Sequence, residues 1–66
     1  MRNKVEYWRT RRGMSVSELA RRSGISRQTV IRLERDRGAN TNMNTIVSMA
    51  RALEVPVDDL FFADDG

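Results

Sequence analysis

The sequence predicts an all-α fold made of five short helices. Apolar residues recur at helical spacing, Ser residues stand where N-caps are needed, and Gly or Pro follows the periodic segments. The predicted helices span approximately residues 2–12, 16–23, 27–35, 43–53 and 57–62, within a single domain over residues 1–66.

The composition limits how so short a chain is stabilised. A chain of 66 residues buries only about 60% of its unfolded surface, so its core is small. It has no Cys and no His, which excludes disulfides and a Cys/His zinc site, and we expect no metal and no cofactor. A well-packed helical core, a partner subunit or both remain to stabilise the fold.

The sequence gives no signal for export or membrane insertion. The basic N-terminus is not followed by the apolar run that a signal peptide requires. The longest uninterrupted apolar stretch, residues 60–63, is far too short to span a bilayer. We therefore expect a cytoplasmic protein with no membrane partner.

The net charge of +3 conceals an asymmetry along the chain. Residues 1–37 hold eleven Lys and Arg against four acidic residues, a net charge of +7. Residues 38–66 hold one Arg against five acidic residues, a net charge of −4. Eleven of the twelve basic residues are Arg, whose rigid donor fork matches phosphates and guanine edges. The asymmetry favours an anionic partner over a merely solvated surface.

The first two helices are delimited by caps and glycines. In the first helix, Val5 and Trp8 are three residues apart and are expected to face the core. Ser15 and Glu18 have the spacing of a capping box, in which each side chain accepts from the other residue's backbone N–H. Gly24 is expected to end the second helix in a left-handed conformation.

The later helices show similar signals. Ser26 is a good N-cap for the third helix, and the fifth helix follows Val55-Pro56 and carries Asp58 and Asp59 in its first turn, where the helix dipole favours them. The fourth helix has an apolar stripe that is expected to face the core and that comprises Met43, Ile46, Val47, Ala50 and Leu53.

The second and third helices are joined by only three residues, 24–26, and so predict a helix-turn-helix unit. A turn this tight makes the helices cross steeply, and the small Ala20 lets the second helix approach the first. The second helix of such a unit enters the DNA major groove with its N-terminus first. Arg pairs with guanine edges, Gln pairs with adenine, and the Thr methyl contacts thymine. The predicted base-reading residues are Arg27, Gln28, Thr29 and Arg32.

The resemblance to a known family rests on two sets of residues. The first set comprises Gly13-Met14-Ser15, Glu18-Leu19-Ala20, Gly24-Ile25-Ser26-Arg27-Gln28-Thr29-Val30 and Arg32-Leu33-Glu34. The second comprises Ala50-Arg51-Ala52-Leu53, Val55 and Asp58-Asp59-Leu60-Phe61. With these motifs, residues 4–62 resemble the lambda-repressor/Cro (XRE) helix-turn-helix family. The resemblance implies a five-helix domain that binds operator DNA as a dimer.

The resemblance also implies roles for individual residues. Arg27, Gln28 and Arg32 match base readers, and Ser26 and Thr29 match base or phosphate contacts. The family usually has Gln or Thr at the position of Val16, so Ser15 or Ser17 takes that phosphate contact here. The loop and the start of the fourth helix grip the DNA backbone, here through Arg37, Asn40, Thr41 and Asn42. Arg9 and Glu34 match a structural ion pair between the first helix and the recognition helix.

Two further features concern the C-terminal part of the chain. Glu54 replaces the glycine that commonly ends the family's fourth helix, and a left-handed Glu54 costs roughly 1 kcal/mol. Leu60, Phe61 and Phe62 are the candidates for a homodimer interface, because one Phe completes the core and the other has little left to bury against. A symmetric dimer would place two recognition helices about one DNA turn apart, on an inverted repeat.

Three functional classes follow from these observations. The preferred hypothesis is a repressor that binds double-stranded DNA and blocks transcription. The alternative is an antitoxin or protein-interaction module in which DNA binding is secondary. We do not expect an enzyme, because the sequence has no His or Cys, no P-loop and no paired carboxylates in a plausible pocket. We also expect no small-molecule ligand.

Overall fold

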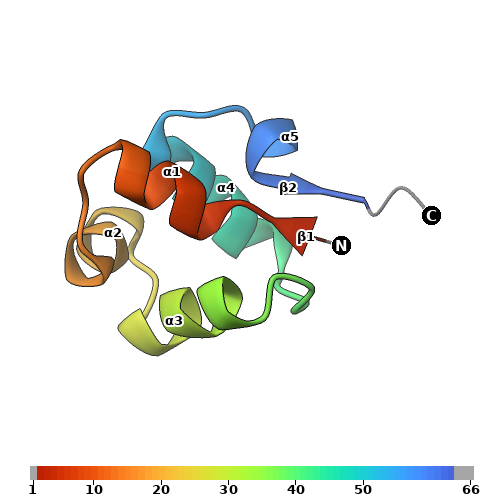
Figure 1. Ribbon diagram of the computed structural model, residues 1–66, viewed down its shortest axis with the longest axis horizontal. Helices are drawn as coiled ribbons and strands as arrows, with labels where there is room; N and C mark the ends of the chain where they lie inside the picture. Colours follow the sequence, from red (N-terminus) through yellow and green to blue (C-terminus); the bar gives the residue numbers. More distant parts are fainter. Residues whose placement is uncertain (1, 64–66) are drawn as a thin grey trace.

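The computed structural model describes residues 2–63, which form five helices and a two-stranded antiparallel sheet (Figure 1). The helices are α1 (Val5–Arg11), α2 (Val16–Ser23), α3 (Arg27–Arg35), α4 (Met43–Leu53) and α5 (Val57–Leu60), and the strands are β1 (Arg2–Asn3) and β2 (Phe61–Phe62). The predicted five-helix fold is therefore confirmed, and α2, α3 and α4 begin and end at the predicted residues. Residue 1 and residues 64–66 of the predicted domain lie outside the described residues.

The first predicted helix begins later than expected, because residues 2–3 form a strand. Arg2 lies opposite Phe62 and Asn3 lies opposite Phe61 in an antiparallel register. The Asn3 side chain accepts a 3.0 Å hydrogen bond from the backbone N–H of Val5, which is otherwise unpaired at the start of α1. Strand pairing and this side-chain hydrogen bond together fix the start of α1 at Val5. At its other end α1 stops at Arg11, with Arg12 as the C-cap.

The fifth predicted helix ends two residues earlier than expected. Phe61 has extended backbone angles, φ −125° and ψ 132°, and belongs to β2. The backbone N–H of Lys4 donates to the Leu60 carbonyl at 2.9 Å, which continues the contact between the two ends of the chain. Helical structure over residues 61–62 is thus replaced by pairing with β1.

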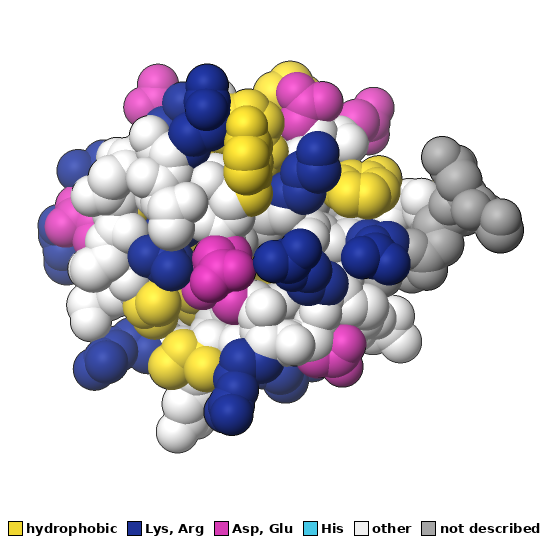
Figure 2. Space-filling model, viewed as in Figure 1, with side chains coloured by type: hydrophobic (Ala, Val, Ile, Leu, Met, Phe, Trp, Pro, Cys, Tyr) yellow, Lys and Arg dark blue, Asp and Glu magenta, His cyan; other side chains and the backbone are white. Residues whose placement is uncertain are grey.

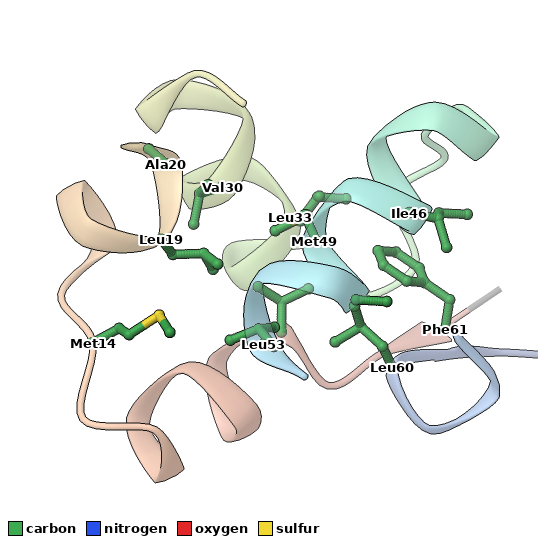
Figure 3. Close-up of a cluster of buried hydrophobic side chains, with 12 residues drawn as sticks. Met14, Leu19, Ala20, Val30, Leu33, Ile46, Met49, Leu53, Leu60 and Phe61 are labelled. Atoms are coloured by element: carbon green, nitrogen blue, oxygen red, sulfur yellow. The ribbon is translucent and has the colours of Figure 1, made fainter. Parts of the chain in front are cut away.

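The core lies where all five helices and β2 meet (Figure 3). Fully buried side chains come from each helix, and the largest are Leu19, Leu33, Met49, Leu53, Leu60, Val5 and Val30. Trp8 is half-buried against this cluster and donates its indole N–H to the Asp59 carbonyl at 3.1 Å. The indole therefore connects α1 to α5, as well as adding apolar contact.

The predicted apolar stripe of α4 is wrong at its first position. Met43 is 64% exposed, whereas Met49 and Thr45 are buried. Met43 is the first residue of α4, so it extends past the edge of the core that Ile46 and Leu53 fill. A large apolar side chain is therefore left on the surface.

Glu54 ends α4 with a left-handed backbone, φ 57° and ψ 47°. The backbone N–H of Glu54 donates to carbonyls of the last turn of α4. The Arg12 guanidinium donates to the carbonyls of Leu53 at 2.7 Å and Glu54 at 3.3 Å. Arg12 also lies over the Trp8 ring, 5.2 Å from its centroid. The helix end is well paired, but a residue with a Cβ adopts a conformation that favours glycine.

We expect Glu54→Gly to raise the free energy of unfolding by about 1 kcal/mol, because glycine removes the left-handed strain at this helix end. Chemical denaturation monitored by circular dichroism measures the change. Glu54→Ala is the matched control, since it removes the carboxylate and keeps a Cβ. A Gly variant no more stable than the Ala variant would contradict the strain argument.

Candidate nucleic-acid interface

The turn between α2 and α3 fixes how the two helices cross. Gly24 ends α2 with φ 70°, a left-handed conformation that glycine adopts without strain. The N–H of Ile25 then bonds the Ala20 carbonyl at 3.2 Å, and Ser26 caps α3 by accepting from the Thr29 N–H at 3.1 Å. One helix ends and the next begins within three residues, as the sequence predicts.

One side of α3 is buried and the other is open. Val30 and Leu33 are fully buried, while Arg27, Gln28 and Arg32 are exposed. Ile31 lies among these exposed residues, because positions 27, 28, 31 and 32 share one helix face. We call these four residues the reading face.

Ile31 is 38% exposed and is not among the site residues predicted from the sequence. The spacing in the sequence could have identified Ile31, because it lies three residues after Gln28 and four after Arg27 and so shares their helix face. An apolar side chain between cations can contact a thymine methyl group, the role predicted from the sequence for Thr29.

Ser26 and Thr29 are placed together by the cap of α3. The Ser26 hydroxyl donates to the Thr29 hydroxyl at 2.9 Å and accepts from the Thr29 backbone N–H. Thr29 is half-buried, so its methyl group is less open than the side chains of the reading face. The cap still leaves backbone N–H groups at the start of the helix, where anions bind readily.

The loop after α3 is held against the reading face. The Arg32 guanidinium donates to the Asn40 carbonyl at 3.2 Å, so this predicted base reader contacts the loop here. Asn42 caps α4 by accepting from the Thr45 N–H at 2.8 Å. Thr41 is half-buried and Asn40 is exposed. The predicted phosphate contacts 40–42 thus lie on a segment joined to the reading face by Arg32.

Arg37, the remaining predicted phosphate contact of this loop, is exposed. Its guanidinium lies 3.4 Å from the Glu6 carboxylate, and its side chain is 59% exposed. An exposed pair of this length contributes little to stability. Arg37 can therefore exchange Glu6 for a phosphate at small cost.

The start of α2 forms half of the predicted capping box. Ser15 accepts from the Glu18 N–H at 3.0 Å. The Glu18 carboxylate does not return this bond; it accepts from Arg22 at 2.6 Å and from Arg21 at 3.0 Å. These two hydrogen bonds lower the pKa of Glu18, and the bond from Arg22 has the larger effect. Ser17 is exposed, and Ser15 is engaged as the N-cap.

The Arg9–Glu34 pair is bidentate and largely buried. The Arg9 guanidinium donates to the two carboxylate oxygens of Glu34 at 2.6 and 3.1 Å and to the Met14 carbonyl at 2.8 Å. The side chains are 15% and 10% exposed. The hydrogen bond that Arg9 donates to Glu34 raises the pKa of Arg9. The pair joins α1 and the segment before α2 to the last turn of α3.

Only part of the predicted dimer contact reaches the surface. Leu60 is fully buried and Phe61 is 5% exposed, so both belong to the chain's own core. Phe62 is half-buried and borders a groove of about 380 Å³. The groove is lined by Met43, Ile46, Val57, Asp58, Phe61, Phe62 and Ala63. We call it the apolar groove; sequence reasoning missed its exposed member Met43 by assigning it to the core.

Lys and Arg side chains are spread over the face of the molecule in Figure 2, including the lower edge formed by α3. Hydrophobic and acidic side chains lie between them. The reading face belongs to the part of the chain, residues 1–37, whose net charge of +7 attracts a polyanion. Among the described residues, no helix has both the length and the apolar character needed to cross a bilayer.

Comparisons with known proteins agree on one family. The model of the family described as "Helix-turn-helix" matches residues 5–60. The chain is 32% identical to an uncharacterised HTH-type transcriptional regulator of Archaeoglobus fulgidus, over 98% of this chain and 91% of that protein. It is 29% identical to one of Methanocaldococcus jannaschii, over 98% and 97%. The crystal structure of the restriction-modification controller protein C.AhdI from Aeromonas hydrophila is similar, with a TM-score of 0.79 and 33% identity over 86% of this chain and 85% of that chain.

We expect Arg9→Ala to lower the free energy of unfolding by about 3 kcal/mol, because it leaves the Glu34 carboxylate largely buried without its partner. Thermal denaturation of Arg9→Ala, Glu34→Ala and the double variant measures the coupling. The double variant should be less destabilised than the two single effects added together. Strictly additive changes in the free energy of unfolding would show that the interaction between Arg9 and Glu34 does not stabilise the fold.

Proposed function

Because this chain belongs to the helix-turn-helix family, we propose that it binds double-stranded DNA through the reading face and represses transcription at the bound site. The chain is a transcriptional regulator with a helix-turn-helix DNA-binding domain. Beyond this, we propose that the chain recognises a specific base sequence, forms a homodimer and binds an inverted-repeat operator. The observation that carries it is the exposed face of α3, opposite a fully buried one.

Base readout follows from the chemistry of the reading face. Arg27 and Arg32 can each donate two bonds to a guanine edge, and Gln28 can donate to and accept from adenine. Arg32 must then leave the Asn40 carbonyl, a single exposed hydrogen bond. Ile31 supplies an apolar contact for a thymine methyl group. The operator half-site should therefore contain G, A and T at neighbouring positions.

Phosphate contacts position this face in the groove. We assign them to the starts of α2, α3 and α4, where Ser15, Ser26 and Asn42 hold one backbone N–H each and leave others free. Ser17, Asn40 and Thr41 add polar side chains, and Arg37 adds a charge. These contacts supply affinity for any sequence, and the reading face supplies preference.

The homodimer is proposed to form through the apolar groove. Met43 is exposed beside half-buried Phe62 and Val57, and a symmetric copy covers all three at once. Such a dimer carries two reading faces, one for each half-site of an inverted repeat. A dimer bound over a promoter excludes RNA polymerase from that site, and this steric block is the proposed mechanism of repression.

The test of the function is selection of binding sites from random duplex DNA with the purified protein at about 0.15 M salt, the ionic strength at which screening is physiological. An enriched inverted repeat supports a dimeric, sequence-specific regulator. Weak binding without enrichment would overturn the proposal. It would favour the alternative in which the domain binds a partner protein, as an antitoxin does.

We expect Gln28→Ala to weaken binding to the selected site by about 1–3 kcal/mol and to relax preference at one base pair, because its amide reads one adenine. Fluorescence anisotropy with the selected and scrambled duplexes measures both effects. Arg37→Ala is the contrasting control: it should weaken binding to both duplexes and reduce the salt slope by about one. Equal loss on both duplexes for Gln28→Ala would exclude direct readout.

We expect Phe62→Ser to dissociate the dimer, because it removes an aromatic side chain from the edge of the apolar groove. Sedimentation equilibrium measures the association, and anisotropy measures the loss of affinity for a full inverted repeat. Tyr7→Ser is the matched control, since Tyr7 is another aromatic residue that reaches the surface but lies on α1, outside the groove. A Phe62 variant that associates as the wild-type protein does would remove the groove from the interface.

A further inference from the structure

Asn3 is a buried polar residue near the start of the chain, and its side chain makes three hydrogen bonds. It is 3% exposed, in a strand of two residues. Its side-chain oxygen accepts from the Val5 N–H at 3.0 Å. Its amide nitrogen donates to the Leu33 carbonyl at 3.1 Å and the Arg37 carbonyl at 3.3 Å. A buried amide with these partners holds them in a defined arrangement.

The partners of Asn3 belong to separate parts of the fold. Leu33 lies in the last turn of α3, whose carbonyls have no partner within the helix. Arg37 belongs to the loop that follows. The backbone of Asn3 pairs with Phe61 in β2, whose next residue, Phe62, borders the apolar groove. Asn3 therefore bridges the groove side of the molecule and the C-terminal end of α3.

We propose that Asn3 is a positioning residue that fixes the tilt of α3 relative to the dimer interface, and thereby sets the spacing between half-sites that the dimer accepts. The inference rests on the proposed dimeric function. In a symmetric dimer, the distance between the two recognition helices must match the DNA repeat of about 34 Å. Any element that fixes α3 against β2 controls that distance.

The geometry makes this end of α3 an effective point of control. Asn3 holds the helix near its last turn, whereas Arg27 and Gln28 lie in the first turn. Residues 27 and 33 are separated by about 9 Å along the axis, at a rise of about 1.5 Å per residue. A change of tilt at the held end displaces the reading residues, while the chemistry with which each reads a base is unchanged.

Asn3→Asp separates the two roles of the side chain. The carboxylate keeps an oxygen for the Val5 N–H, but it has no N–H for the Leu33 and Arg37 carbonyls. Asn3→Ser also keeps an acceptor and lacks the amide donors. Both variants are made in the Glu54→Gly background to raise the folded fraction. Met49→Val in the same background is the control, because it disturbs the core and leaves all bonds of Asn3 intact.

The experiment measures binding to duplexes in which two selected half-sites are separated by spacers of different length. The wild-type chain and Met49→Val should strongly prefer one spacing. In both Asn3 variants, the ratio of affinities between the preferred spacing and the other spacings should fall about tenfold. This is the scale of the effect expected when a buried hydrogen-bonding group is left unpaired. Their base preference within a half-site should not change. A merely structural role would lower the folded fraction without altering the spacing preference of the folded protein.

The outcomes separate this inference from the proposed function. Asn3 variants with the wild-type spacing preference overturn the inference and leave the dimer intact. A wild-type protein without any spacing preference overturns the dimeric function itself, and the inference with it. A second measurement needs no substitution: solvent exchange of the Asn3 side-chain amide should slow when the wild-type protein binds the inverted repeat. Unchanged exchange would contradict the bridge.

Discussion

The left-handed turn at Gly24 is the constraint on which the other contacts of α3 depend. Because of this turn, α2 ends and α3 begins within three residues, so the two helices lie close together. A helix placed in this way can bury only one side, through Val30 and Leu33, and must leave the other open. Because the open side contributes nothing to folding, the remaining support for α3 has to come from its ends.

Each end of α3 is held by a different kind of interaction. Ser26 satisfies a backbone N–H at the start, a local bond that any short helix can make. The last turn depends on distant residues: Arg9 binds Glu34, and Asn3 binds the Leu33 carbonyl. Removing Arg9 from water carries a cost, which two carboxylate bonds and the Met14 carbonyl offset. The first residues of the chain are therefore part of the support for the reading face.

Local signals predicted the middle of the fold and failed at its edges, for a physical reason. Caps and glycines act within a few residues, so the bounds of α2, α3 and α4 could be read from the sequence. The pairing of Asn3 with Phe61 joins the two ends of the chain, and no local periodicity encodes it. Apolar spacing likewise does not tell where a core ends, so Met43 was assigned inward and Ile31 was overlooked.

The exposed apolar residues and the charge asymmetry together restrict how two copies can meet. Met43 and Phe62 lie in the part of the chain that carries a net charge of −4, and the reading face lies in the part that carries +7. Contact through the basic part would bring like charges together and cover the residues that we propose to face DNA. Contact through the apolar groove brings together the less strongly charged parts of two copies, so the repulsion is weaker, and it leaves both basic surfaces open to phosphates. The same charge separation therefore favours one interface for a second copy and another for DNA.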